Sequence, residues 1–177
     1  MNKIFKIIAV AGLVFTALQS CESRKVIVNR EVQTSAGGSM LLGTQTKEQL
    51  LKSPYSDWYQ PEYDEYQTDK EAVAQLKKAK LNSYNIILVM GTWCGDSHRE
   101  VPRLMKILDE LKYPLQKLTI IAVNRKKESP NGEEGLYNIQ RVPTIIVQKY
   151  GKEVGRIIES TKSGWLEKDL LEIIQKD

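Results

Sequence analysis

The sequence predicts an α/β domain in which a central mixed β-sheet is flanked by helices. Two apolar runs, 85–90 and 117–123, are typical of strands buried on both faces, because their consecutive positions are apolar. A helical pattern separates the two runs, so we expect a βαβ unit with parallel strands. Two further strands, 143–148 and 153–159, are separated by a turn signal, which predicts an antiparallel hairpin.

The helices are predicted from apolar residues that recur at helical spacing and from capping residues. Residues Thr68 to Glu71 form a candidate capping box, and Pro102 is expected to kink the helix that contains it. The predicted helices are 46–53, 68–81, 98–111, a short one near 133–137, and 163–175.

The composition is that of an ordinary globular protein. The chain has 177 residues, of which 41% are hydrophobic and 27% charged, and this suits one domain with additional segments. The formal net charge of +4 falls to +2 when residues 1–20, which hold two lysines and no acid, are set aside. Because no basic cluster with interleaved aromatic residues is present, we expect no nucleic-acid partner.

Residues 1–20 have the layout of a secretory signal peptide. Two lysines precede an apolar run, 7–18, that is too short to span a bilayer comfortably. The segment ends in the tetrapeptide Leu18-Gln19-Ser20-Cys21. This tetrapeptide resembles the signal of bacterial lipoproteins, although Gln19 departs from it, since a small residue is more usual there.

The resemblance implies that Cys21 becomes a lipid-modified N-terminus. Several acyl chains would anchor the protein stably to a membrane, on the periplasmic side of the cell envelope. A lipid-modified Cys21 could not form a disulfide with Cys94, the second of the two cysteines. The alternative is a plain secretory signal that leaves the Cys21 thiol unmodified.

The folded domain is expected at 46–177, after a flexible linker at 21–45. The linker residues show no sustained periodicity and include the stretch 35–39, which is rich in glycine and serine. The domain opens with five aromatic residues, namely Tyr55, Trp58, Tyr59, Tyr63 and Tyr66. We interpret them as an extension packed on the core, since burying such a ring contributes about 1.5–3 kcal/mol. The alternative is an exposed recognition surface for a partner or peptide.

The candidate site is a hexapeptide between the first buried strand and the helix after it. Its sequence is Trp93-Cys94-Gly95-Asp96-Ser97-His98. At a helix N-terminus, unpaired N–H groups and the positive end of the dipole stabilise a thiolate, so Cys94 is the candidate nucleophile. Trp93 is expected to shield the thiol, and His98 is the single histidine of the chain.

The neighbours of Cys94 are expected to tune its reactivity. Gly95 permits a tight turn and the close approach of a partner chain. Ser97 either donates a hydrogen bond to the thiolate or caps the helix. Asp96 disfavours the thiolate through like charge, whereas His98 and Arg99 favour it, and the net direction stays open. One histidine and one free cysteine fall short of a zinc site, so we expect no metal and no cofactor.

The order of elements, with a cysteine at the first βα turn, resembles the thioredoxin fold over residues 68–177. Three motifs carry the resemblance: the start Trp93-Cys94-Gly95, the later Pro102, and the loop Val142-Pro143-Thr144 with Gly151 eight residues after its proline. The chain also resembles thioredoxin-like lipoproteins of Gram-negative bacteria. The resemblance implies that Pro143 is cis and faces Cys94, and that Val142, Pro143 and Thr144 form an edge that pairs with the substrate backbone.

Two positions depart from the thioredoxin pattern. Ser97 replaces the second cysteine, and Leu88 stands where thioredoxins carry a buried acid. Both losses weigh against an efficient dithiol reductase. A single thiol at Cys94 can form a mixed disulfide with a protein or small-molecule client, but it needs an external thiol to leave it.

We therefore expect a membrane-tethered, monothiol thioredoxin-like protein of the cell envelope that acts in thiol–disulfide exchange as an oxidoreductase or isomerase. In this interpretation Cys94 is the nucleophile, and Ser97 and His98 tune it. Two alternatives stay open. In the first, Cys94 is an inert relic on an inherited scaffold. In the second, the protein is a non-catalytic binding module that presents either its aromatic surface or its Pro143 groove to an envelope partner.

Overall fold

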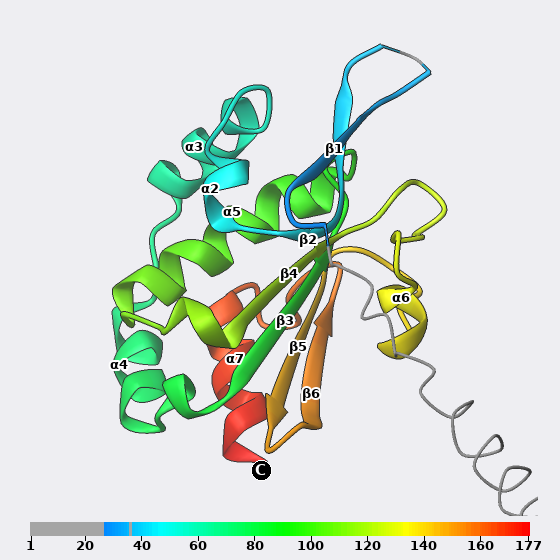
Figure 1. The fold of residues 1–177 in the computed structure, drawn as a ribbon. Coiled ribbons are helices and arrows are strands. Elements are labelled where there is room, and N and C mark those ends of the chain that lie inside the picture. Colours follow the sequence, from blue (N-terminus) through cyan, green and yellow to red (C-terminus); the bar gives the residue numbers. More distant parts are fainter. Residues whose placement is uncertain (1–26, 36) are drawn as a thin grey trace, which may run out of the picture.

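A six-stranded mixed sheet forms the centre of the structure, a computed structural model that describes residues 27–35 and 37–177 (Figure 1). The predicted signal peptide, 1–20, and the predicted lipidation site, Cys21, lie outside these residues. The strands are β1 (Arg30–Gln33), β2 (Ser39–Gln45), β3 (Asn85–Met90), β4 (Leu118–Ala122), β5 (Thr144–Lys149) and β6 (Lys152–Ile158). The helices are α2 (Lys47–Leu50), α3 (Ser56–Glu65), α4 (Lys70–Lys78), α5 (Gly95–Glu110), α6 (Glu133–Leu136) and α7 (Leu166–Gln175).

The strand order is β1-β2-β4-β3-β5-β6. Strands β3 and β4 are parallel, with Val89 opposite Ile121, and α5 connects them. Strand β3 is antiparallel to β5, which forms a hairpin with β6. The predicted βαβ unit, the hairpin and the α/β class with a mixed sheet are therefore confirmed.

The prediction of a flexible linker at 21–45 is wrong for its second half. Strands β1 and β2 form an antiparallel hairpin in which Val32 pairs with Met40. Strand β2 then joins the sheet beside β4, with Gly43 opposite Ala122. Gly37 and Gly38, from the stretch rich in glycine and serine, thus lie in the turn of a hairpin. The alternation of apolar and polar residues is weak in this part of the sequence because most of β1 is exposed on both faces. The folded domain therefore begins well before residue 46.

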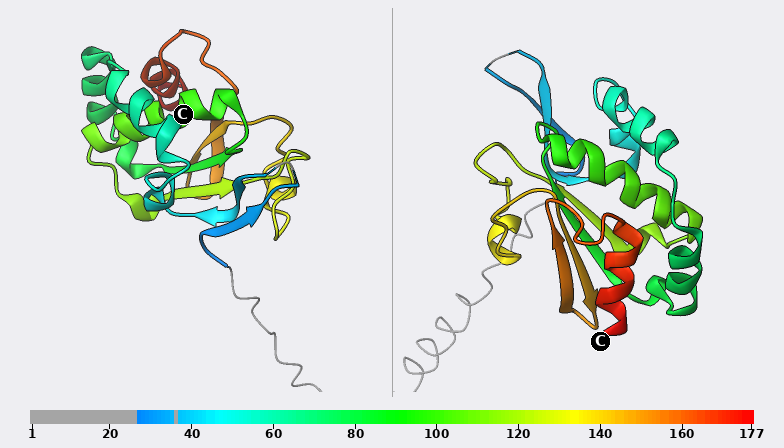
Figure 2. Two further views of the ribbon diagram at one scale, coloured as in Figure 1. Left: turned by 90° about the horizontal axis from the view of Figure 1, so that it is seen from above. Right: turned by 180° about the vertical axis from the view of Figure 1, so that it is seen from behind.

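Four helices, α3, α4, α5 and α7, lie on one side of the sheet (Figures 1 and 2). Alternate residues of β3 point to the two sides, as the period of a strand requires. Ile86, Leu88 and Met90 pack in the larger core cluster with α5 and α7. Ile87 and Val89 pack in a second cluster, which the segment after α6 covers with side chains that include Ile139 and Val142.

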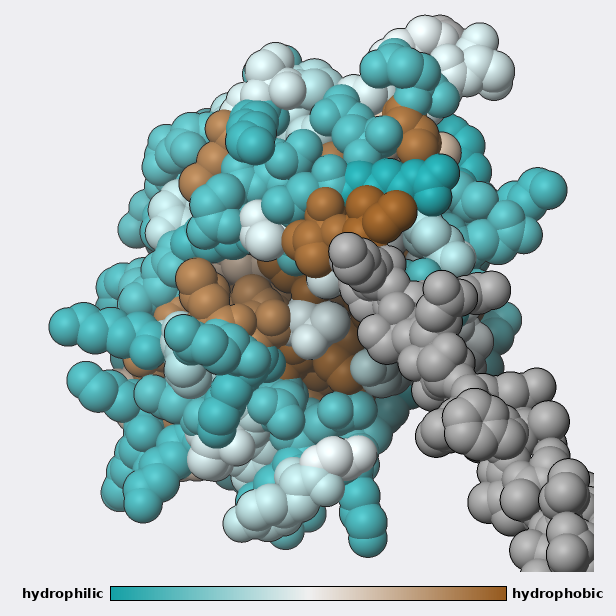
Figure 3. All heavy atoms as spheres, viewed as in Figure 1, coloured by the Kyte–Doolittle hydropathy of each residue, from teal (hydrophilic) through white to brown (hydrophobic). Residues whose placement is uncertain are grey.

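The face that carries the second cluster is seen in Figure 3. Hydrophilic residues surround it, and hydrophobic residues gather toward its middle, over the sheet. Strands covered on both sides explain why the runs at β3 and β4 are almost wholly apolar. No helix in the described part of the chain has the length and apolar character needed to cross a membrane.

The aromatic residues of the extension pack on the core. Tyr55, Tyr59 and Tyr66 are buried, while Trp58 and Tyr63 are half-buried and pack against the same cluster. Most of them lie on or beside α3, which packs along α5. The predicted packed extension is therefore confirmed, and the alternative of an exposed aromatic recognition surface is wrong.

The starts of α4 and α5 differ from the prediction in their capping residues. Asp69, not Thr68, caps α4, and its side chain accepts a 2.9 Å hydrogen bond from the Ala72 N–H. Aspartate is as good an N-cap as threonine, and Thr68 instead donates to the Glu110 carboxylate on α5. Helix α5 begins at Gly95, three residues before the predicted start, so Cys94 itself is the N-cap residue.

Candidate thiol site

Cys94 occupies the junction between β3 and α5. Its backbone is extended, and its carbonyl accepts the first helical hydrogen bond, 3.0 Å from the His98 nitrogen. The side chain is half-buried, and the thiol is free. Cys94 therefore lies where the sequence predicts it, at a helix N-terminus. A thiolate formed here faces the N-terminus of a 16-residue helix, whose dipole stabilises negative charge.

The loop before β5 faces this thiol. The Val142–Pro143 peptide bond is cis, as the resemblance implies. The Sγ–H of Cys94 donates to the carbonyl oxygen of Val142 at 3.2 Å. The next carbonyl, of Pro143, accepts from the Glu159 N–H at 2.7 Å, and Thr144 Oγ1 donates to the Arg141 carbonyl at 2.7 Å. The structure therefore brings Cys94, Val142 and Pro143 together, with the loop fixed from behind.

Ser97 is completely buried one helical turn after Cys94. Its Oγ accepts a hydrogen bond from the Gly91 N–H at 3.2 Å. Within the described residues, no hydrogen bond joins Ser97 to Cys94, and the N-cap position belongs to Cys94. The expected N-cap role of Ser97 is thus wrong, whereas its expected hydrogen bond to a Cys94 thiolate stays a prediction. It provides the acceptor that the buried Gly91 N–H needs.

His98 is held between the aromatic extension and the turn before the cysteine. Its ring stacks on Trp58, with centroids 4.3 Å apart and planes 9° from parallel. Its Nε2 lies 2.8 Å from the carbonyl oxygen of Thr92. A carbonyl can only accept, so Nε2 carries the hydrogen. His98 therefore braces the backbone of the Cys94 turn, and no hydrogen bond to the thiol is present among the described residues.

The charged residues of the first turns of α5 form ion pairs with one another. Arg99 bridges Asp96, at 2.9 Å, and Glu100, at 2.8 Å. The hydrogen bond to Glu100, followed by its charge and the contacts with Asp96, raises the pKa of the Arg99 guanidinium above its ordinary value. Glu100 is only 3% exposed, and its second oxygen has no partner among the described residues. The charge of Arg99 is thus compensated by two carboxylates beside it.

Trp93 is locked beside the turn. Its Nε1–H donates to the Val123 carbonyl at 2.9 Å, and the Arg125 guanidinium lies 5.4 Å from the ring centroid. A Cβ on Gly91 would lie 2.6 Å from Trp93 Cε2, so the ring requires glycine at that position. Leu88, further back on β3, is completely buried among apolar side chains. The strand below the site thus supplies no titratable group at the position where thioredoxins carry an acid.

Sequence reasoning missed the part of the site that comes from the N-terminal hairpin. Thr92 Oγ1 accepts a 3.3 Å hydrogen bond from the Leu41 N–H of β2, which ties the hairpin to the Cys94 turn. The loop after β4, residues 124–128, lies on the other side of Trp93. The sequence did hold a signal for the loop 124–128. This loop follows the carboxyl end of a predicted parallel strand, which is where α/β folds usually bind ligands.

No group of three or more His, Cys, Asp or Glu side chains in the described part of the chain is placed to hold a metal ion. The chemistry that the site itself offers is that of a single accessible thiol.

A cysteine that opens a helix and faces a cis-proline loop defines a thiol site on an α/β fold. Residues 64–172, more than half of the chain, match the family model described as Thioredoxin. The chain belongs to the thioredoxin family.

The chain also resembles solved structures. An HIV epitope-scaffold protein matches with a TM-score of 0.52 and 16% identity, over 69% of this chain and 82% of that chain. Mitochondrial thioredoxin 3 of Saccharomyces cerevisiae matches at 20% identity, over 59% and 90% of the two chains, with a TM-score of 0.37. A thioredoxin of Schistosoma mansoni matches at 25% identity, over 63% and 93%, with a TM-score of 0.36. No curated protein matches the chain. The scaffold supports the fold, and the family rests on the matched residues.

Proposed function

We propose that the protein is a membrane-tethered, monothiol member of the thioredoxin family that exchanges thiols and disulfides in the cell envelope. One observation carries this proposal. The half-buried Cys94 opens α5 at 3.2 Å from the Val142 carbonyl, and Ser97 occupies the place of a resolving thiol. The site can therefore start an exchange, and it lacks the internal thiol that would complete one.

The exchange has two steps. The Cys94 thiolate attacks one sulfur of a client disulfide, the client S–S bond breaks, and the other client sulfur leaves as a thiolate that takes a proton from water. An external thiol, as its thiolate, then attacks the client sulfur of the mixed disulfide. Cys94 is displaced as a thiolate, and the external thiol ends in a disulfide with the client.

The Val142–Pro143 edge supplies the binding surface for the client. When Cys94 is a thiolate or is bonded to a client, its S–H no longer donates to Val142. That carbonyl can then accept a backbone N–H of the client. In the thioredoxin family this edge pairs with the substrate backbone, and the Pro143 carbonyl is already occupied here by Glu159. The Val142 carbonyl is thus the acceptor that becomes free for the client when Cys94 loses its S–H.

The envelope location and the lipid anchor are supported by the N-terminal sequence. Residues 7–18 have the length of a secretory apolar segment, and Cys21 stands at its end. A Cys21→Ser variant is expected to move from the membrane fraction to the soluble fraction. Unchanged membrane fractionation of this variant would contradict lipidation at Cys21.

The exchange is tested by the intact mass of the purified protein after reaction with a disulfide-bonded peptide at neutral pH. Wild-type protein is expected to gain the mass of one peptide chain and to lose it when reduced glutathione is added. A Cys94→Ser variant should gain nothing. A folded wild-type protein that forms no adduct, yet binds the peptide as tightly as the variant does, would favour a binding module and overturn exchange.

A further inference from the structure

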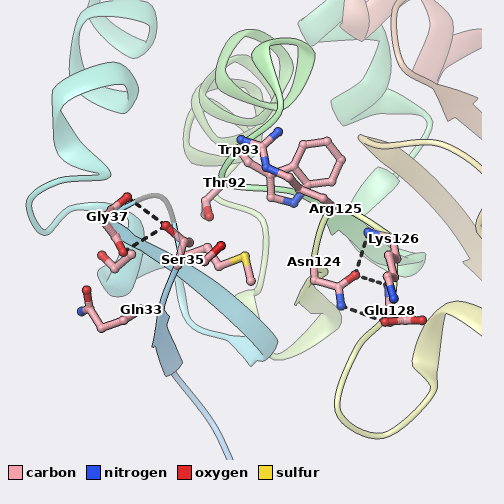
Figure 4. Close-up of a pocket in the computed structure, with 13 residues that line it drawn as sticks. Gln33, Ser35, Gly37, Thr92, Trp93, Asn124, Arg125, Lys126 and Glu128 are labelled. Carbon is pink, nitrogen blue, oxygen red and sulfur yellow. Dashed lines mark hydrogen bonds between the residues drawn. The ribbon is translucent and has the colours of Figure 1, made fainter.

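A cavity of about 550 Å³ lies beside the thiol site (Figure 4). The β1–β2 hairpin forms one wall, the loop after β4 forms another, and Thr92 and Trp93 close it between them. The hairpin precedes the residues that match the thioredoxin model, 64–172. One wall of the cavity beside the Cys94 turn therefore comes from residues outside the region that matches the thioredoxin model.

The loop wall is basic. Arg125 and Lys126 both line the cavity and are exposed, and neither forms an ion pair with a described residue. Glu128 is the one acidic residue of the lining, and its carboxylate accepts a 2.9 Å hydrogen bond from the Asn124 amide. Positive charge thus exceeds negative charge within the cavity, and the two cations are available to a ligand.

Asn124 holds this loop in a fixed shape. Its Oδ1 accepts from the backbone N–H groups of Lys126, at 2.8 Å, and Glu128, at 3.0 Å. Its own N–H donates to the Glu128 carbonyl at 3.0 Å. Arg125, between these anchors, lies over the Trp93 ring. Because the loop is ordered before a ligand arrives, little conformational entropy is lost when one binds.

The hairpin wall is uncharged and mostly polar, with Met40 as its apolar side chain. It contributes hydroxyl groups and backbone from residues that include Thr34, Ser35 and Ser39, and no carboxylate. Thr34 Oγ1 donates to the Gly37 carbonyl at 2.8 Å, which stabilises the turn. In Figure 4 this wall stands across the cavity from Asn124, Arg125 and Lys126. It can hydrogen-bond a ligand without neutralising the basic loop.

We propose that this cavity binds a carboxylate-bearing segment of the client, next to the client cysteine that reacts with Cys94. The inference rests on the proposed exchange function and names its substrate class, an acidic polypeptide. Trp93 forms the wall of the cavity and directly precedes Cys94 in the chain. A segment held there lies beside the nucleophile, and attraction to the two cations speeds its arrival.

The test compares two disulfide-linked peptides that differ only in having Glu or Gln on either side of the cysteine. The Glu peptide is expected to form the Cys94 adduct about three to ten times faster at low salt, the range for one or two exposed charge pairs. High salt should reduce this ratio. Lys126→Gln and Arg125→Gln should each reduce it at least about twofold.

Lys127→Gln is the matched control. Lys127 is adjacent in the same loop and carries the same charge, but it does not line the cavity. The ratio should therefore stay at the wild-type value in this variant. Equal rates for the two peptides, or an equal effect of Lys126→Gln and Lys127→Gln, would overturn the subsite and leave the exchange function standing. A preference seen with dithiodipropionic acid over its diamide, and absent with the peptides, would overturn the polypeptide assignment.

A second measurement does not depend on thiol chemistry. The Cys94→Ser protein is titrated with cysteine-free Glu and Gln peptides, and the amide resonances of Arg125 and Lys126 and the Trp93 indole resonance are followed by NMR. The Glu peptide is expected to shift all three, and the Gln peptide to shift them less. If the wild-type protein forms no adduct but these shifts appear, the exchange function fails and the subsite stands. Shifts equal for both peptides would overturn the subsite.

Discussion

The indole of Trp58 stacks on the imidazole of His98, with ring centroids 4.3 Å apart and ring planes within 9° of parallel. His98 in turn holds the backbone of the turn before Cys94, because its Nε2–H donates to the Thr92 carbonyl at 2.8 Å. Trp58 lies on α3, in the extension before the residues that match the thioredoxin model. The extension therefore supports the geometry of the thiol site as well as the core.

Replacing Trp58 by Ala should both destabilise the protein and slow its thiol chemistry. The loss of a half-buried stacked ring is expected to cost about 1–3 kcal/mol of unfolding free energy. Without the stack, His98 is free to leave Thr92, so adduct formation at Cys94 should slow. Urea unfolding and adduct kinetics measure the two effects. Trp58→Phe, which retains a ring, is the control, and an Ala variant with wild-type values in both measurements would contradict the bracing role.

Gly91→Ala should displace the Trp93 ring. The added Cβ would meet Cε2 of that ring at 2.6 Å, so the indole must move and its 2.9 Å hydrogen bond to the Val123 carbonyl must lengthen. Overpacking of this kind costs about 1–3 kcal/mol. Unfolding curves and the Trp93 indole resonance check the prediction. The control is Gly95→Ala, since a Cβ there meets no neighbour. Equal stability of the two variants would show that Gly91 is not required.

Ser97→Cys should convert the site into a dithiol reductase. The new thiol lies one turn after Cys94 on the same helix, so it can attack the mixed disulfide without an external thiol. Turnover of a peptide disulfide with a chemical reductant should rise at least about tenfold over wild type.

Ser97→Ala is the control for this experiment. It removes the acceptor of the buried Gly91 N–H and should cost about 1–3 kcal/mol of stability without any gain in turnover. A folded Ser97→Cys protein with wild-type turnover would show that the site does not accept disulfide substrates.

Tyr63 should make a pH-dependent contribution to stability. Burial, together with the 2.8 Å hydrogen bond that it donates to Asp109, raises the pKa of Tyr63 to about 12. Its unfolded value is about 10. Because the pKa of Tyr63 is higher in the folded than in the unfolded protein, its protonated phenol stabilises the fold. This contribution is complete below the unfolded pKa of about 10, and it is lost as the pH rises through the folded pKa of about 12.

Tyr63→Phe is therefore expected to cost about 0.5–1.5 kcal/mol at neutral pH, the usual worth of one hydrogen bond. The difference in unfolding free energy between wild type and variant should narrow above pH of about 10. Urea unfolding from neutral to alkaline pH measures it. Other tyrosines titrate equally in both proteins, so a gap that stays constant throughout would contradict the assigned role of the Tyr63 phenol.

The sequence predicted the central fold well because the strongest patterns lie there. Strands β3 and β4 are covered on both sides, so their runs are almost wholly apolar, and α5 keeps a clear helical period. The N-terminal hairpin was missed because β1 is mostly exposed and polar and β2 lies toward the edge of the sheet. Each residue of β2 that pairs with β4 has its partner 75 residues or more away in the chain, as for Gln45 and Ile120. Local patterns do not encode such contacts.

The thiol site was predicted in position but not in all its contacts. Cys94 and the Val142–Pro143 edge meet as the motifs imply. Ser97 and His98 were expected to tune the thiol, yet each binds a backbone group of the preceding turn, at Gly91 and Thr92. A sequence motif states which residues are near in the chain, whereas the hydrogen-bond partner of a side chain depends on the packed turn around it.

The most direct test of exchange at Cys94 is mass spectrometry of Cys94-linked partners captured in intact cells. Cells that express the protein are quenched with acid, free thiols are alkylated, and peptides that contain Cys94 are isolated without reduction. We expect mixed disulfides between Cys94 and client cysteines, absent after treatment with an external thiol and absent from a Cys94→Ser strain. Recovery of Cys94 wholly as an alkylated free thiol, in cells whose other envelope disulfides are preserved, would contradict exchange at Cys94.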